Sequence, residues 1–236
     1  MISSLVRGRA AVLVASALIC VATAVSAQAG ALDTVTSKDA ASGLRTALSQ
    51  GIDTAVAQLG AQNGFLNDPK VVIPLPPALK KGEKALRMVG MGVEADNLKA
   101  AMNHAAEAAV AESKPVFKDA LQKMTLADAK GILTGGDDAA TQYFRRATTA
   151  RLTEKFKPIV ARETQKLQVA SLYDRYAGKA AEFGLISPQD ANLNDYVTAR
   201  ALDGLFSRIA DEERAIRKDP LGQTSSLLKK VFGALQ

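Results

Sequence analysis

Apolar residues recur at intervals of three and four along almost the whole chain beyond residue 36. This spacing places them on one face of an α-helix, whereas a half-buried strand needs strict alternation. The chain is therefore predicted to be all-α. Pro115 and Pro158 fall inside two of the longer patterns and are expected to kink or interrupt those helices. The predicted helices cover residues 37–59, 77–89, 94–124, 125–134, 137–183, 193–218 and 224–235.

One stretch departs from the helical pattern. Residues 64–77 contain Asp68-Pro69 and then Pro74-Leu75-Pro76-Pro77, and prolines this close together exclude both a helix interior and a central strand. We expect an extended crossover here, with residues 71–73 as the only β-like segment. Seven or eight helices and this Pro-rich extended link predict a single-domain, bundle-like assembly over residues 28–236.

Residues 1–27 have the order of a secretory signal peptide. Two arginines are followed by an apolar run and then by small residues up to Ala27, without any acidic side chain. The apolar run is shorter than the ~20 residues of a membrane-spanning helix, which disfavours the alternative of an uncleaved anchor. We expect cleavage after Ala27, with Ala29 as the second choice, and export to the periplasm without a transmembrane span. Lipoprotein anchoring through Cys20 is disfavoured because the bulky Ile19 precedes it.

Composition removes several classes of function. The chain has one cysteine, one histidine and no tryptophan, which excludes a disulfide framework, a zinc finger and any site that needs two imidazoles. We expect no metal and no cofactor. Lys and Arg number 30 against 24 Asp and Glu, which gives a net charge of +6, and only 5% of the residues are aromatic. Since export also separates the chain from nucleic acids, we do not expect it to bind them.

Two helix starts are marked by capping residues. Thr125 and Asp128 have the spacing of a capping box, with Asp in place of the usual Glu. Asp137 or Asp138 follows two glycines and is expected to cap the next helix through its side chain. Capping explains this pair of acidic residues better than anion binding does, because the carboxylates already occupy the helix N-terminus.

Five groups of residues carry a resemblance to a known family. Together, and in this order, they resemble an uncharacterised bacterial envelope family, domain of unknown function 4197. The resemblance covers nearly the whole chain after the signal segment. It implies an exported, helical, single-domain protein, and it implies no activity. The groups are Met102-Asn103-His104-Ala105-Ala106-Glu107; Met124-Thr125 with Asp128-Ala129 and Ile132-Leu133; Ala139-Ala140-Thr141 with Tyr143-Phe144; Phe156-x-Pro158-Ile159-Val160; and Leu202-Asp203-Gly204-Leu205-Phe206 with Glu212-Glu213, Ile216-Arg217 and Asp219-Pro220.

Polar residues within these strings are the candidate site. They either meet on the floor of a ligand-binding pocket or form a buried network that joins helices. Glu213 stands four residues before Arg217, which is the favourable order for an ion pair on a helix. The candidate ligand-binding residues are Asn103, Glu107, Asp128, Arg145 and Arg217.

Catalysis is an alternative with less support. A hydrolase or lyase that works with carboxylates and arginine would use Glu107, Asp128 and Arg145. His104 and Glu107, at i and i+3, could form an acid/base pair, but a hydrogen bond on the helix surface is the more ordinary explanation. The sequence offers no nucleophile or metal constellation, so we assign no catalytic residue.

A basic stretch over residues 142–166 supplies a second candidate surface. Its cations lie along one flank of an apolar helical stripe if the helix continues through Pro158. That flank could meet anionic lipid headgroups, or the acidic end of an amphiphile whose tail enters the bundle. Alternatively it is a solvated face whose long side chains cover apolar surface. The flank consists of Arg151, Lys155, Arg162 and Lys166.

The sequence therefore predicts a non-enzymatic exported protein. It is expected to bind an apolar or anionic amphiphile, or an envelope protein, between its helices. The alternatives are the hydrolase or lyase described above and a purely structural interaction module. An exposed apolar patch on residues 224–235 would favour the last of these.

Overall fold

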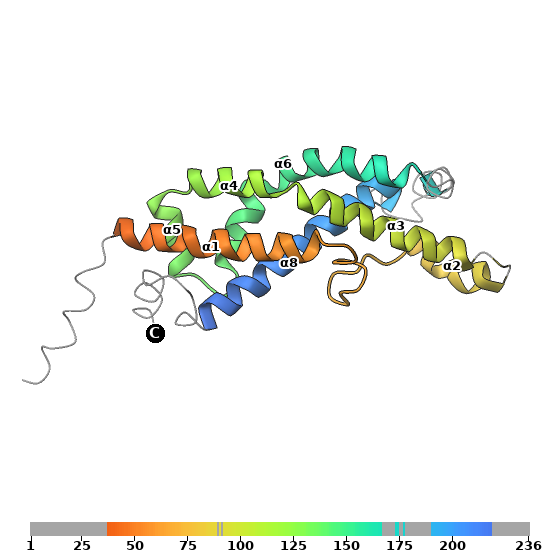
Figure 1. The fold of residues 1–236 in the computed structure, drawn as a ribbon, viewed down its shortest axis with the longest axis horizontal. Coiled ribbons are helices and arrows are strands. Elements are labelled where there is room, and N and C mark those ends of the chain that lie inside the picture. The colour runs from red at the N-terminus through yellow and green to blue at the C-terminus, as the bar shows by residue number, and fades with distance from the viewer. Residues whose placement is uncertain are drawn as a thin grey trace, which may run out of the picture. The chain divides into compact units, whose positions relative to one another are not determined.

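The computed structural model describes residues 37–218, except for residues 89, 91, 167–172, 175–176 and 178–189. The described residues form helices and contain no strand, so the predicted all-α class is confirmed (Figure 1). The helices are α1 (Ser37–Leu59), α2 (Pro77–Met88), α3 (Gly92–Ala111), α4 (Lys114–Lys123), α5 (Leu126–Leu133), α6 (Ala139–Thr164) and α8 (Leu193–Lys218).

Several predictions fall on other parts of the chain. The signal segment of residues 1–27 and the helical pattern of residues 224–235 lie outside the described residues, as does most of the pattern after residue 166. The predicted total of seven or eight helices rested in part on these segments.

The core lies where α3, α6 and α8 pack together, with α1 packed across α8 (Figure 1). Alanines at the buried face of α3 present little bulk, so neighbouring helix backbones can approach closely. Beside them, the Phe117 ring meets the rings of Phe144 and Phe206 edge to face, with centroids 5.5 and 6.3 Å apart. Edge-to-face contacts of this kind add to the stabilisation from burial alone.

The two internal prolines have different effects. The predicted helix over residues 94–124 is divided into α3 and α4, and Pro115 occupies the first turn of α4, where its missing N–H has no partner to lose. Pro158 was expected to interrupt its helix, and this is wrong, because α6 continues through it. Pro158 is exposed, so water can satisfy the carbonyl that the missing N–H leaves free.

Candidate functional site

The extended link of residues 70–77 is held against α3 by a buried amide. The Asn103 side chain donates to the carbonyl of Ile73 at 2.9 Å and accepts from the N–H of Ile73 at 2.8 Å. It thus pairs both backbone groups, as a neighbouring strand would. The expected β-like segment over residues 71–73 is therefore not a strand: the N–H groups of Val71 and Val72 close a turn on the carbonyl of Asp68, and Ile73 is paired by a side chain instead of a neighbouring strand.

The loop before the link is held by a buried carboxylate from the next turn of α3. Glu107 accepts three backbone N–H hydrogen bonds, at 3.1, 3.1 and 3.4 Å. His104 contacts the same loop, because its Nε2 lies 3.0 Å from the Asn63 side-chain oxygen. The expected surface pair of His104 with Glu107 is thereby replaced by two separate contacts to one loop. The three N–H donors are Asn63, Phe65 and Leu66.

On the opposite side, the link is tied to α8 by ion pairs. Asp68 pairs with Arg208, and both side chains are largely buried. One turn further along α8, Asp211 pairs with Lys70 at 3.2 Å. These pairs join residues about 140 positions apart in the sequence. They hold the start of the link against α8.

Gly204 allows the loop to approach the α8 backbone. A Cβ atom at this position would lie 2.6 Å from Cε1 of Phe65 and 3.2 Å from Cβ of Val71. Both of those side chains are buried, so neither can move away without disturbing its neighbours. The glycine is therefore required by packing.

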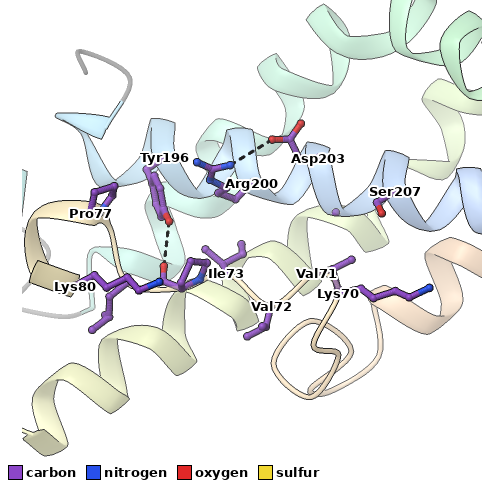
Figure 2. A pocket seen from close by; sticks show the side chains of 13 residues that line it. Lys70, Val71, Val72, Ile73, Pro77, Lys80, Tyr196, Arg200, Asp203 and Ser207 are labelled. Carbon is purple, nitrogen blue, oxygen red and sulfur yellow. Dashed lines mark hydrogen bonds and ion pairs between the residues drawn. The ribbon is translucent and has the colours of Figure 1, made fainter. Parts of the chain in front are cut away.

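A groove of about 520 Å³ opens between the extended link and α8 (Figure 2). Its size lies within the range of about 300–1,000 Å³ that is usual for ligand sites. One wall is apolar, because valine, isoleucine, leucine and proline side chains of the link make up most of it. Lys80 of α2 lies at the groove as well. The other wall is one face of α8, formed by Tyr196, Arg200, Asp203, Gly204 and Ser207.

Two of the cations that line this groove, Lys80 and Arg200, have no carboxylate within hydrogen-bonding distance among the described residues. Lys80 makes no hydrogen bond or ion pair with any residue that the structure describes. The Arg200 guanidinium lies 5.3 Å from the Tyr196 ring centroid and reaches Asp203 only at 3.8 Å. That separation is longer than a hydrogen bond. Arg200 thus makes no hydrogen bond to a carboxylate among the described residues, and its guanidinium lies at the groove.

Tyr196 supplies a polar group within the apolar part of the groove. Its hydroxyl donates to the carbonyl of Pro74 at 3.2 Å, which closes the wall formed by the link (Figure 2). Burial raises the pKa of the Tyr196 phenol above its ordinary value of 10.0, although Arg200 opposes this shift. The phenol therefore stays protonated and acts as a donor at neutral pH.

A second polar cluster joins α5, α6 and α8. The buried Glu213 carboxylate accepts from the N–H groups of Ala140 and Thr141 at 2.9 and 2.8 Å, and from the Thr141 hydroxyl at 2.8 Å. Arg217 pairs with Glu213 at 2.9 Å and donates to the carbonyl of Ile132 at 2.8 Å. The predicted pair is confirmed, and it caps the start of α6 and the end of α5 at once.

This arrangement corrects one prediction about capping. Asp138 occupies the N-cap position of α6, but its side chain makes no capping hydrogen bond and instead accepts from Gln142. The carboxylate of Glu213, from a distant helix, takes that role. The cavity beside Glu213 and Arg217 measures only about 10 Å³, which is no more than the space of one water molecule.

Asp128 and Arg145 lie in further, separate sets of contacts. Asp128 completes the predicted capping box, with reciprocal hydrogen bonds to Thr125 at 2.9 and 3.1 Å. Hydrogen bonds from Thr125 hold the pKa of the Asp128 carboxyl below its ordinary value of 3.8. Arg145 lies 4.6 Å from the Phe206 ring centroid and pairs with Asp203 at 3.3 Å.

The five candidate ligand-binding residues therefore do not meet in one place. Asn103 and Glu107 support the link and its loop, Arg217 belongs to the Glu213 cluster, and Asp128 and Arg145 each have their own partners. Asn103 and Arg145 reach the groove indirectly, since their partners Ile73 and Asp203 line it. That any of the five contacts a ligand stays a prediction.

The basic flank of α6 is matched by carboxylates. Glu163 forms ion pairs with two of the four cations of the flank, at 3.1 and 2.6 Å, and Asp119 and Glu112 pair with the other two. The flank is therefore less cationic in the fold than its sequence suggests. These pairs are exposed, and exposed pairs contribute little to stability. The four cations are Arg151, Lys155, Arg162 and Lys166.

Sequence reasoning missed the residues that line the groove. Lys80, Tyr196 and Arg200 are not among the candidate residues that the sequence indicates. A signal did exist on α8, where Arg200, Asp203 and Ser207 follow Tyr196 at helical spacing. Only the fold shows that the extended link lies opposite this face.

Comparison with known proteins identifies the family. A family model described as protein of unknown function (DUF4197) matches residues 34–233. The chain belongs to this family. The DUF4197 match includes the link, the groove and both polar clusters. Neither a curated protein nor a solved structure matches the chain.

Neither a candidate metal site nor a candidate membrane-spanning helix occurs among the described residues. Within them, no group of three or more histidine, cysteine, aspartate or glutamate side chains is placed to hold a metal ion. No helix in the described part of the chain combines the length and the hydropathy of a membrane span.

Proposed function

We propose that this protein is an exported, non-enzymatic binding protein whose groove between the extended link and α8 takes an amphiphile with an anionic head. The observation that carries the proposal is the pairing of an apolar wall with two cations, Lys80 and Arg200, that lack close carboxylate partners in the described residues. Export is part of the proposal and rests on the signal-like order of residues 1–27.

The groove favours this class of ligand on two grounds. The apolar side chains of the link that are not buried, Val72, Pro74 and Pro77, would lose water on contact with a hydrocarbon tail, which is favourable in proportion to the area covered. A carboxylate or phosphate head would accept hydrogen bonds from the planar guanidinium of Arg200. Lys80 would add a second positive charge at the same groove.

The remaining polar residues support binding over catalysis. Glu107, Asp128 and Arg145, which a hydrolase or lyase would bring together, belong to three separate sets of hydrogen bonds. Each of these sets already has a structural role. A general acid or base must reach the proton that it transfers, and the three side chains share no contact through which they could act together.

The proposal is tested by titrating the protein with a fluorescent fatty acid that carries a free carboxylate. The groove variant Lys80→Gln/Arg200→Gln removes both of these cations, and we expect its affinity to fall on the order of tenfold. The matched control is Arg162→Gln/Lys166→Gln, which removes two cations from the flank of α6. Its affinity should stay within about twofold of the unmodified protein, because surface pairs contribute little.

A second probe separates head from tail. The methyl ester of the same fatty acid lacks the charge, and it should bind the unmodified protein about as weakly as the free acid binds the groove variant. Absence of binding by the unmodified protein, or a greater loss in the flank variant than in the groove variant, would contradict the proposal.

A further inference from the structure

Helices α2 and α3 form a hairpin whose turn is braced. Gly90 adopts a φ of +83°, a left-handed conformation that glycine takes without strain. Arg87 then bridges the two helices, pairing with Glu83 of its own helix at 2.9 Å and with Asp96 of α3 at 2.6 Å. A Cβ at Gly92 would lie 3.3 Å from two atoms of the Arg87 side chain. Arg87 therefore links the end of α2 to the first turns of α3.

This braced turn carries exposed apolar side chains. Met88 is 76% exposed and Val93 is 67% exposed, and we call these two residues the hairpin tip. In the described part of the chain, Leu126 on α5 is the only other exposed large hydrophobic residue, at 47%. Single exposed apolar residues are normal. Two of them where α2 ends and α3 begins indicate a contact surface.

The charges next to the tip identify the kind of surface that it fits. Helix α2 carries three lysines and Arg87 against one acidic residue, Glu83. Arg87 is matched by Glu83 and Asp96, so among the described side chains Lys80 and Lys84 provide the unmatched charge, while Glu94 at the start of α3 opposes it. A second copy of the same hairpin would place like charges face to face, which disfavours self-association. The lysines are Lys80, Lys81 and Lys84.

We propose that the hairpin tip docks onto an anionic lipid surface. Met88 and Val93 enter the headgroup region, and the lysines of α2 lie along the lipid phosphates. Apolar residues beside a basic helix face are the combination that holds peripheral helices at anionic membranes. The tip residues Met88 and Val93 do not line the groove, and Lys80 is the residue that the two proposals share.

Vesicle co-sedimentation of the full chain tests the proposal, with every variant carrying the same N-terminus. Vesicles of phosphatidylcholine with about 30% phosphatidylglycerol should bind the protein, and vesicles of phosphatidylcholine alone should bind it much more weakly. The tip variant Met88→Ser/Val93→Ser should lose on the order of tenfold in affinity for the anionic vesicles. Lys84→Gln should lose less, and its loss should disappear at high salt.

Two controls complete the design. Leu126→Ser removes an exposed apolar side chain elsewhere on the fold, and Arg162→Gln removes an exposed cation of α6; both should bind vesicles as the unmodified protein does. Circular dichroism of the tip variant should match the unmodified protein, since both side chains are exposed. Equal binding by the tip variant and the unmodified protein overturns the proposal. The proposal is also overturned if the tip variant binds vesicles normally but no longer binds an envelope protein that the unmodified protein binds. That result would make the tip a protein-docking site.

Discussion

Glu213→Gln tests whether the buried carboxylate joins three helices. In the folded protein, Glu213 accepts two backbone N–H groups and one hydroxyl at the start of α6, and it pairs with Arg217. Glutamine has nearly the same shape but only one oxygen, and its NH₂ group would face the remaining N–H donors of Ala140 or Thr141. The substitution therefore removes charge and acceptor capacity without creating a cavity.

The expected loss follows from these contacts. A buried N–H left without an acceptor costs about 1–3 kcal/mol. Removing one partner of a buried ion pair costs about 3–5 kcal/mol in all. Arg217 retains its hydrogen bond to Ile132, so we expect the lower end, about 3 kcal/mol of the free energy of unfolding. A typical domain has only about 5–15 kcal/mol in total, so the variant should be markedly less stable.

Urea denaturation followed by far-ultraviolet circular dichroism measures this loss at neutral pH. The matched control is Glu163→Gln, which removes a carboxylate that also serves two cations but lies at the surface. Its cost should be about 1 kcal/mol or less. If Glu213→Gln were no less stable than Glu163→Gln, the buried carboxylate would not hold α6 to α8, and the reasoning would be refuted.

Three further predictions concern stability. Gly204→Ala should cost about 1–3 kcal/mol in urea denaturation, because the added methyl group overlaps the Phe65 ring; equal stability would show that the loop can move. Asn103→Ala should cost about 1–3 kcal/mol and speed hydrogen exchange over residues 70–77, since Ile73 loses both backbone partners; unchanged exchange there would count against this role. Burial raises the pKa of Glu212 above 4.5, so the fold holds its proton more tightly than the unfolded chain does and disfavours the charged form. Glu212→Gln should therefore raise the free energy of unfolding at neutral pH, and the difference from the unmodified protein should shrink as the pH falls through the raised pKa. A difference that is absent at neutral pH, or that grows in acid, would contradict a raised pKa for Glu212.

Features set by nearby residues were predictable from the sequence. The capping box of Thr125 with Asp128 and the pair of Glu213 with Arg217 depend on spacings within one helical turn, and both are present. The helical faces were predictable for the same reason. Where a local rule competed with the surroundings, it failed: an exposed Pro158 is tolerated inside α6, although proline usually interrupts a helix.

The candidate site was less predictable because it depends on contacts between distant segments. Nothing near Glu213 in the sequence indicates that it caps α6 in place of Asp138, and nothing near Lys80 places that residue beside Arg200. The polar residues that stood out in sequence serve mainly to hold the fold. The groove is lined instead by ordinary apolar residues and by cations that have no recognisable motif.

Hydrogen exchange of the full chain, with and without the carboxylate fatty acid, tests the central claim most directly. Binding in the groove should slow exchange in the two segments that form its walls, residues 70–77 and 196–207, and leave residues 151–166 unchanged. Slower exchange confined to residues 151–166 would place the ligand on the basic flank of α6 and contradict the account, as would unchanged exchange throughout at saturating fatty acid.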